Sequence, residues 1–110
     1  VRMMIEDEHH NVVGIVDIIN FDPKNMRAEV GIVIKQDYRN KGYALATITR
    51  IKAYAANILH LHQLYACINK DNERSLALFE KSGFIKSNEL KDWLFDGKKY
   101  HNALLMQLFL

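Results

Sequence analysis

Alternation of apolar and polar residues predicts β-strands in the first third of the chain. Two hydrophobic segments, residues 2–6 and 12–19, flank the polar stretch 7–11, which is typical of an antiparallel hairpin with a longer loop. Segment 12–19 is apolar on both faces apart from Asp17, so we expect an interior strand that is covered on both sides. Segment 26–34 then alternates, with even-numbered residues on one face and odd-numbered residues on the other.

Two residues of segment 26–34 are unusual for a strand. Glu29 is a charged residue inside the strand, which is costly unless the side chain is paired or faces a cleft. Gly31 indicates a bulge, or a close approach by another chain or a ligand.

The hydrophobic period changes to that of a helix after residue 41. Apolar residues between positions 41 and 59 recur at steps of three and four, which places them in one stripe of an α-helix. A short strand is expected at 64–68. A second helix should begin after Asn72, a suitable N-cap, and end at Gly83.

Two more strands are expected at the end of the chain, at 84–90 and 99–109, joined through Trp93 and the turn Asp96-Gly97. The predicted order is three strands, a helix, a strand, a helix and two strands. This order predicts an α/β (α+β) fold, with a mixed, mostly antiparallel sheet of about six to seven strands and helices packed on it.

Composition narrows the class of protein further. With 110 residues, 49% of them apolar, the chain is expected to form a single domain, residues 1–110. One cysteine, Cys67, excludes an internal disulfide and favours a reducing, cytoplasmic compartment. A net charge of +2 and the lack of a long apolar run argue against nucleic acid and membrane partners. The histidines lack further ligands at metal-binding spacing, so we expect no metal.

The segment 36–44 carries the clearest chemical signal, because it joins a strand to a long helix and contains a glycine and a small residue. Free N–H groups and the positive end of the helix dipole form an anion site at such a position. Neither phosphate-binding fingerprint of nucleotide folds is present. The alternative interpretation is an ordinary loop.

Within this segment, Arg39-x-x-Gly42-x-Ala44 resembles the pyrophosphate loop, R/Q-x-x-G-x-G/A, of the GNAT superfamily of N-acetyltransferases. Residues 72–84 resemble its second signature, in which an Asn opens a helix that ends in Gly-Phe. Residues 93–102 resemble the closing hairpin of the branch that contains spermidine N-acetyltransferases and ribosomal-protein Nα-acetyltransferases. In that superfamily a first strand and two helices would precede Val1, so we expect the upstream part of the fold to be missing.

The resemblance implies acetyl-CoA as co-substrate and assigns residues to it. The pyrophosphate would be held by the loop and the helix start, at Arg39, Lys41, Gly42, Tyr43, Ala44 and Leu45. The exposed backbone of Ile32, Val33 and Ile34 would pair with the peptide-like pantetheine arm as an added strand. Asn72 would hydrogen-bond the pantetheine, cap its helix, or do both. CoA would leave beside Ser75 and Phe79.

The resemblance also suggests the catalytic groups. An amine with a pKa near 10.4 is almost fully protonated at pH 7, so a base must remove a proton, and Glu29 is the candidate. The alternative for Glu29 is an ion pair with Arg27 or Lys24. Many superfamily members have a proton-donating Tyr where this chain has Phe79. Ser75 or water would then assist the thiolate, or the protein is a poor catalyst.

The resulting hypothesis is an acetyl-CoA-dependent N-acetyltransferase that works by direct transfer in a ternary complex. The acceptor is a primary amine: a polyamine, a protein N-terminus or another small amine. The alternative is an acyl-CoA-binding regulatory module with little or no turnover. A homodimer is a possible assembly.

Overall fold

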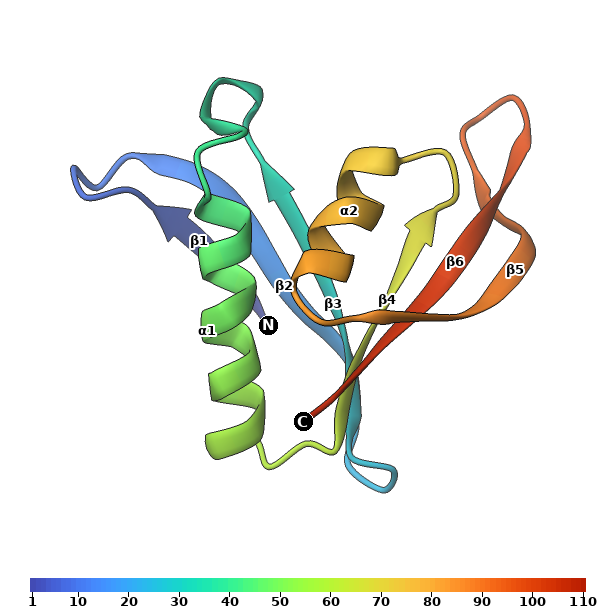
Figure 1. The fold of residues 1–110 in the computed structure, drawn as a ribbon, viewed down its shortest axis with the longest axis horizontal. Coiled ribbons are helices and arrows are strands. Elements are labelled where there is room, and N and C mark those ends of the chain that lie inside the picture. Colours follow the sequence, from blue (N-terminus) through green and yellow to red (C-terminus); the bar gives the residue numbers. More distant parts are fainter.

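One six-stranded sheet with two α-helices makes up the structure, a computed structural model that describes all 110 residues (Figure 1). The strand order is β1-β2-β3-β4-β6-β5, and every neighbouring pair is antiparallel except β3 with β4. The predicted mixed, mostly antiparallel sheet is confirmed. In chain order the elements are β1 (Arg2–Glu6), β2 (Val12–Asp22), β3 (Arg27–Ile34), a short 3-10 helix (Gln36–Tyr38), α1 (Tyr43–Asn57), β4 (Gln63–Asn69), α2 (Glu73–Lys81), β5 (Ile85–Phe95) and β6 (Tyr100–Phe109).

Two strands run further than their sequence pattern predicts. β2 continues to Asp22 instead of ending at residue 19, and β5 continues to Phe95 instead of ending at residue 90. Each extension contains a register shift, so extra residues are taken up as β-bulges and the strand does not end. In β2 the bulge adds one residue, which interrupts the period of two, so alternation of residue types cannot reveal it.

The hydrophobic core lies between the sheet and both helices. Ile48, Ile51 and Ala55 of α1 and Phe79 of α2 belong to the same buried cluster as the inward-facing strand residues. Figure 1 shows the two helices beside each other along the sheet, and contacts join them. Both helices therefore cover one face. Neither is long and apolar enough to span a membrane.

Two expectations about the strands are wrong: that β2 is covered on both faces, and that Gly31 forms a bulge. The face of the sheet opposite the helices carries no helix. β2 is interior but not covered on both sides: Val16 and Ile18 are buried, whereas Ile19 is 44% exposed. Gly31 does not form a bulge, because it pairs in regular register with Asp17, and a Cβ at Gly31 would meet nothing within 4 Å. The bulge lies in β2 instead.

A histidine connects the β5–β6 hairpin to the loop before α2. His101 Nε2 lies 2.7 Å from Asp96 Oδ2, its Nδ1 lies 3.5 Å from Asp71 Oδ2, and its side chain is only 16% exposed. The hydrogen bond with Asp96 is the main reason that the pKa of His101 is raised above its ordinary 6.5. The folded protein therefore favours the protonated imidazole.

We predict that His101→Gln loses a pH-dependent part of its stability. Because folding raises the pKa of His101, the stabilisation is complete below about pH 6.5 and disappears as the pH rises through the folded pKa. Urea unfolding at pH 6 should show the variant less stable than the wild type, and the difference should shrink by pH 9. A difference independent of pH would contradict this.

Candidate active site

The gap between β3 and β4 forms the base of the site. These parallel strands pair at only three positions, Arg27 with Gln63, Ala28 with Leu64 and Glu29 with Tyr65. Beyond that point β3 remains paired with β2 and β4 with β6, so the two strands move apart (Figure 1). Each therefore presents an unpaired backbone edge to the gap.

Alternation along β3 decides which backbone groups face the gap. The Lys35 N–H donates to the Val13 carbonyl of β2 at 2.8 Å. Because hydrogen-bonding direction alternates in an antiparallel pair, Val33 also bonds toward β2, whereas the N–H groups of Ile32 and Ile34 face the gap. An extended ligand lying along β3 would find these donors free.

The amino-terminal end of α1 closes one end of this gap with further free donors. Its N-cap, Gly42, has a φ of 86°, a left-handed conformation that explains why a glycine stands there and why the helix starts at Tyr43 instead of residue 41. No side chain caps the helix, and its first turn contains no acidic residue. The first intrahelical bond is from Ala46 N–H to the Gly42 carbonyl, so the N–H groups before it are available to an anion.

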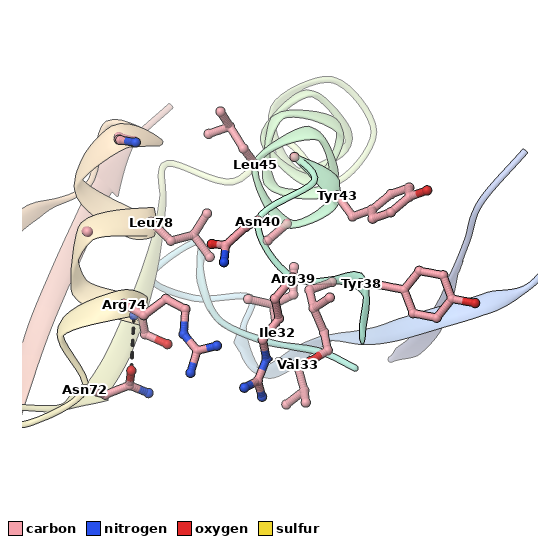
Figure 2. Close-up of a pocket in the computed structure, with 16 residues that line it drawn as sticks. Ile32, Val33, Tyr38, Arg39, Asn40, Tyr43, Leu45, Asn72, Arg74 and Leu78 are labelled. Atoms are coloured by element: carbon pink, nitrogen blue, oxygen red, sulfur yellow. Dashed lines mark hydrogen bonds between the residues drawn. The ribbon is translucent and has the colours of Figure 1, made fainter. Parts of the chain in front are cut away.

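These elements and α2 enclose one groove of about 600 Å³ (Figure 2). Most of the predicted site residues line it: Ile32, Val33, Ile34, Arg39, Gly42, Tyr43, Ala44, Leu45, Asn72 and Ser75. The strand edge, the loop and both helix starts are therefore brought to a single cavity. Lys41, Phe79 and Glu29 are not among its lining residues.

Phe79 and Lys41 have other surroundings. Phe79 is 3% exposed and packs edge-on against Phe84, with ring centroids 4.9 Å apart. It is the buried residue of amphipathic α2. Its side chain therefore packs in the core, although the resemblance implied that CoA would leave beside it. Lys41 Nζ lies 5.7 Å from the centre of the ring of Tyr38, a cation–π contact to a residue that lines the groove, although Lys41 itself does not line it.

Asn72 and Ser75 are joined at the start of α2. The Asn72 Oδ1 accepts a hydrogen bond from the Ser75 N–H at 3.2 Å, so the predicted N-cap is confirmed. The Asn72 amide nitrogen and the Ser75 hydroxyl make no hydrogen bond within the chain, and both residues line the groove. A ligand contact by Asn72 stays a prediction.

Sequence reasoning missed the cationic residues that α2 contributes. Arg74 and Lys81 line the groove together with Arg39, whose Nε donates to the Ile34 carbonyl at 3.2 Å. Figure 2 shows the guanidinium groups of Arg39 and Arg74 on facing sides of the groove. The helical spacing could have indicated them, because residues 74, 78 and 81 lie on the same face of α2 as Ser75, which was predicted to line the site.

Glu29 lies at the last position of β3 that pairs with β4, and it is half-buried. Its neighbours Ala28 and Val30 are buried in the core, so Glu29 points to the sheet face without helices. The Glu29 carboxylate accepts a hydrogen bond from Asn20 Nδ2 at 2.9 Å and makes no ion pair. Arg27 instead pairs with Asp22 at 3.3 Å, so the ion-pair alternative for Glu29 is wrong.

Two titratable side chains of β4 lie near Glu29. The pKa values of Tyr65 and Cys67 are both raised, mainly by burial and further by the Glu29 charge. Both groups are therefore neutral near pH 7, and Cys67 is not an activated nucleophile. No three His, Cys, Asp or Glu side chains gather where they could hold a metal ion, and the absence of a metal stays a prediction.

Comparison with curated proteins finds relatives that acetylate amines. The chain is 29% identical to the spermidine N(1)-acetyltransferase of Vibrio cholerae over 97% of this chain and 62% of that protein. It is 31% identical to the Escherichia coli K12 spermidine N(1)-acetyltransferase, over 87% and 52%. It is 28% identical to the putative ribosomal N-acetyltransferase YdaF of Bacillus subtilis, over 89% and 54%. The chain thus spans 52% to 62% of the lengths of these relatives.

Solved structures and a family model agree with these relatives. A chimera of the V. cholerae spermidine N-acetyltransferase SpeG and hSSAT matches with a TM-score of 0.92 at 29% identity, covering 98% of this chain and 65% of that chain. The family model described as an acetyltransferase (GNAT) domain matches residues 1–85. The resemblance found in the sequence is confirmed, and the chain belongs to the GNAT acetyltransferase family.

Proposed function

We propose that this protein is an acetyl-CoA-dependent N-acetyltransferase that acts on a primary amine by direct transfer in a ternary complex. The observation that carries the proposal is that the free edge of β3 and the uncapped start of α1 open into one groove. Acyl-CoA has two matching parts, a peptide-like pantetheine arm and an anionic pyrophosphate.

In this proposal the cofactor lies across the groove. The pantetheine arm accepts hydrogen bonds from the free N–H groups of Ile32 and Ile34, and Asn72 donates its free amide hydrogens to the same arm. The pyrophosphate binds the N–H groups at the start of α1, and the charges of Arg39, Arg74 and Lys81 surround the phosphates. The groove therefore offers both N–H donors and cationic side chains to the pyrophosphate.

The transfer joins the amine nitrogen to the acetyl carbon and breaks the carbon–sulfur bond of the thioester. The acetyl group reaches through the gap between β3 and β4 toward Glu29, which takes the proton lost by the amine directly or through water. Fixed N–H donors on β3 stabilise the oxyanion that forms on the carbonyl. The electron pair of the broken bond leaves on the CoA sulfur.

The leaving thiolate has one candidate donor in the groove. Phe79 cannot donate a proton, and Figure 2 shows the hydroxyls of Tyr38 and Tyr43 pointing away from Asn72 and Arg74. Ser75 lines the groove, and its hydroxyl makes no hydrogen bond within the chain. A thiol pKa of about 8.5 makes the thiolate an acceptable leaving group, so help from Ser75 or water is sufficient.

The acceptor and the assembly also belong to the proposal. The names of the V. cholerae and E. coli relatives make spermidine the first amine to test. The alternative is an acyl-CoA-binding regulatory module with little turnover, which is favoured by the presence of Phe79, a residue that cannot donate a proton, where many superfamily members have Tyr. Self-association stays a prediction. Trp93, Phe95 and Tyr100, each more than half exposed, give the β5–β6 hairpin a surface for it.

Gly42 and Gly97 form a matched pair for testing the groove. Both have positive φ, 86° and 95°, and a Cβ at either would meet nothing within 4 Å, so a bulky residue strains both alike. A hundredfold excess of acetyl-CoA over its Kd should stabilise the wild type by about 2.7 kcal/mol, several degrees in Tm. Gly42→Trp should abolish this shift, and Gly97→Trp should retain it. No shift in the wild type, or equal shifts in both variants, would refute the binding site.

Glu29→Gln should lower kcat by about a hundred- to ten-thousandfold, because the amide cannot accept the amine proton. Release of the CoA thiol with spermidine and a panel of other amines measures the rate. Asp17→Asn is the control, since Asp17 lies on the same sheet face but is paired with Arg2 at 2.9 Å, and it should retain kcat. Normal turnover by Glu29→Gln would remove Glu29 from the mechanism. Acetyl-CoA binding without thiol release from the wild type would favour the regulatory module.

A further inference from the structure

We propose that Asn20 is a positioning residue for Glu29, which it holds at the point where β3 and β4 separate. The inference rests on the proposed function, in which Glu29 accepts the amine proton. It adds a residue that neither the loop motif nor the helix signatures indicate. Its basis is the bulge in β2 and the hydrogen bond that crosses from this bulge to β3.

The bulge places Asn20 beside Glu29. Ile19 pairs with Glu29 and Asp22 pairs with Arg27, so two residues of β2, Asn20 and Phe21, lie opposite the single residue Ala28. Asn20 has a φ of 52°, in the left-handed region that asparagine tolerates better than most residues. The local backbone therefore turns the Asn20 side chain toward β3, where its Nδ2 donates to Glu29 Oε1 at 2.9 Å.

A neutral donor suits a base better than a cation would. An ionised carboxylate only accepts hydrogen bonds, so Asn20 must present its NH₂ group, and this fixes one oxygen of Glu29. The second oxygen makes no hydrogen bond and is free to take a proton. Other carboxylates in the sheet are held by cations, Asp17 by Arg2 at 2.9 Å and Glu89 by Lys70 at 3.1 Å.

The remaining neighbours leave the charge of Glu29 unopposed. Tyr65 and Cys67 of β4 have raised pKa values and are neutral near pH 7. The nearby charges of Arg27 on β3 and Asp22 on β2 are paired with each other at 3.3 Å. Asn20 is thus the group that sets the orientation of the Glu29 carboxylate.

Two substitutions test whether Asn20 positions Glu29 or only supports the backbone of the bulge. Asn20→Gly keeps a residue suited to positive φ but removes the amide. Asn20→Asp also fits the backbone, because Asp tolerates this region, but it places a second carboxylate against Glu29. The measurement is kcat against pH, from about pH 4 to 9 so that the acid limb of a carboxylate base is included, with acetyl-CoA and the amine both saturating.

The expected results differ for the two variants. Asn20→Gly should lower kcat about 10- to 100-fold with the KM for acetyl-CoA unchanged, because the base is misoriented while the groove is intact. Asn20→Asp should move the acid limb of kcat to higher pH by about one unit or more, because adjacent carboxylates raise the pKa of one member of the pair. A purely structural Asn20 would leave this limb in place.

Measuring Glu29→Gln in the same assays shows whether a negative result concerns Asn20 alone or also the role of Glu29. If Glu29→Gln abolishes turnover but Asn20→Asp keeps the wild-type acid limb and Asn20→Gly keeps kcat, the role of Asn20 is overturned and the proposed function stands. If Glu29→Gln keeps the wild-type rate and pH profile, both Glu29 as base and Asn20 as its positioning residue are overturned. If the wild type releases no thiol with any amine, the proposed function falls and this inference with it.

Discussion

β3 and β4 are hydrogen-bonded to each other only from Arg27 to Glu29 and from Gln63 to Tyr65, although β3 continues to Ile34 and β4 to Asn69. Each strand keeps its other neighbour, so the separation shortens one ladder of the sheet to three pairs and leaves two unpaired backbone edges facing each other. Buried backbone groups need partners, and these edges can be completed by water or by a ligand with peptide-like amides. The groove, its polarity and the position of Glu29 all depend on this separation.

The two helix starts that border the groove are built differently. α1 begins at a left-handed glycine with no side-chain cap and no acidic residue, so its first N–H groups remain free. α2 is capped by Asn72 and has Glu73 in its first turn, so its helix dipole is already satisfied within the chain. An anion is therefore attracted to the start of α1, while α2 contributes the side chains of Asn72, Ser75 and Arg74. This division makes the start of α1, and not the start of α2, the end of the groove that is suited to an anion.

Most of the groove lining was predicted from the resemblance to the GNAT signatures, whereas local patterns in the sequence were sufficient to predict the helices, the strand alternation and the Asn72 cap. These features depend on spacing within a few residues, which the sequence contains directly. The bulge at Asn20, the exposed face of β2 and the burial of Phe79 depend on which elements become neighbours. A pairing between Asn20 and Glu29 crosses two strands and a turn, and no periodicity indicates it. Phe79 matched a family signature by position, but packing against Phe84 decides where its ring lies.

Backbone hydrogen exchange with and without acetyl-CoA tests the central claim most directly, because it observes individual N–H groups. If the cofactor pairs with the free edge of β3 and with the start of α1, the amides of Ile32, Ile34 and the first turn from Tyr43 should become protected on binding. Val33, already bonded toward β2, should change little. Binding that protects neither Ile32 nor the first turn of α1 would contradict the account, because the ligand would then use another surface.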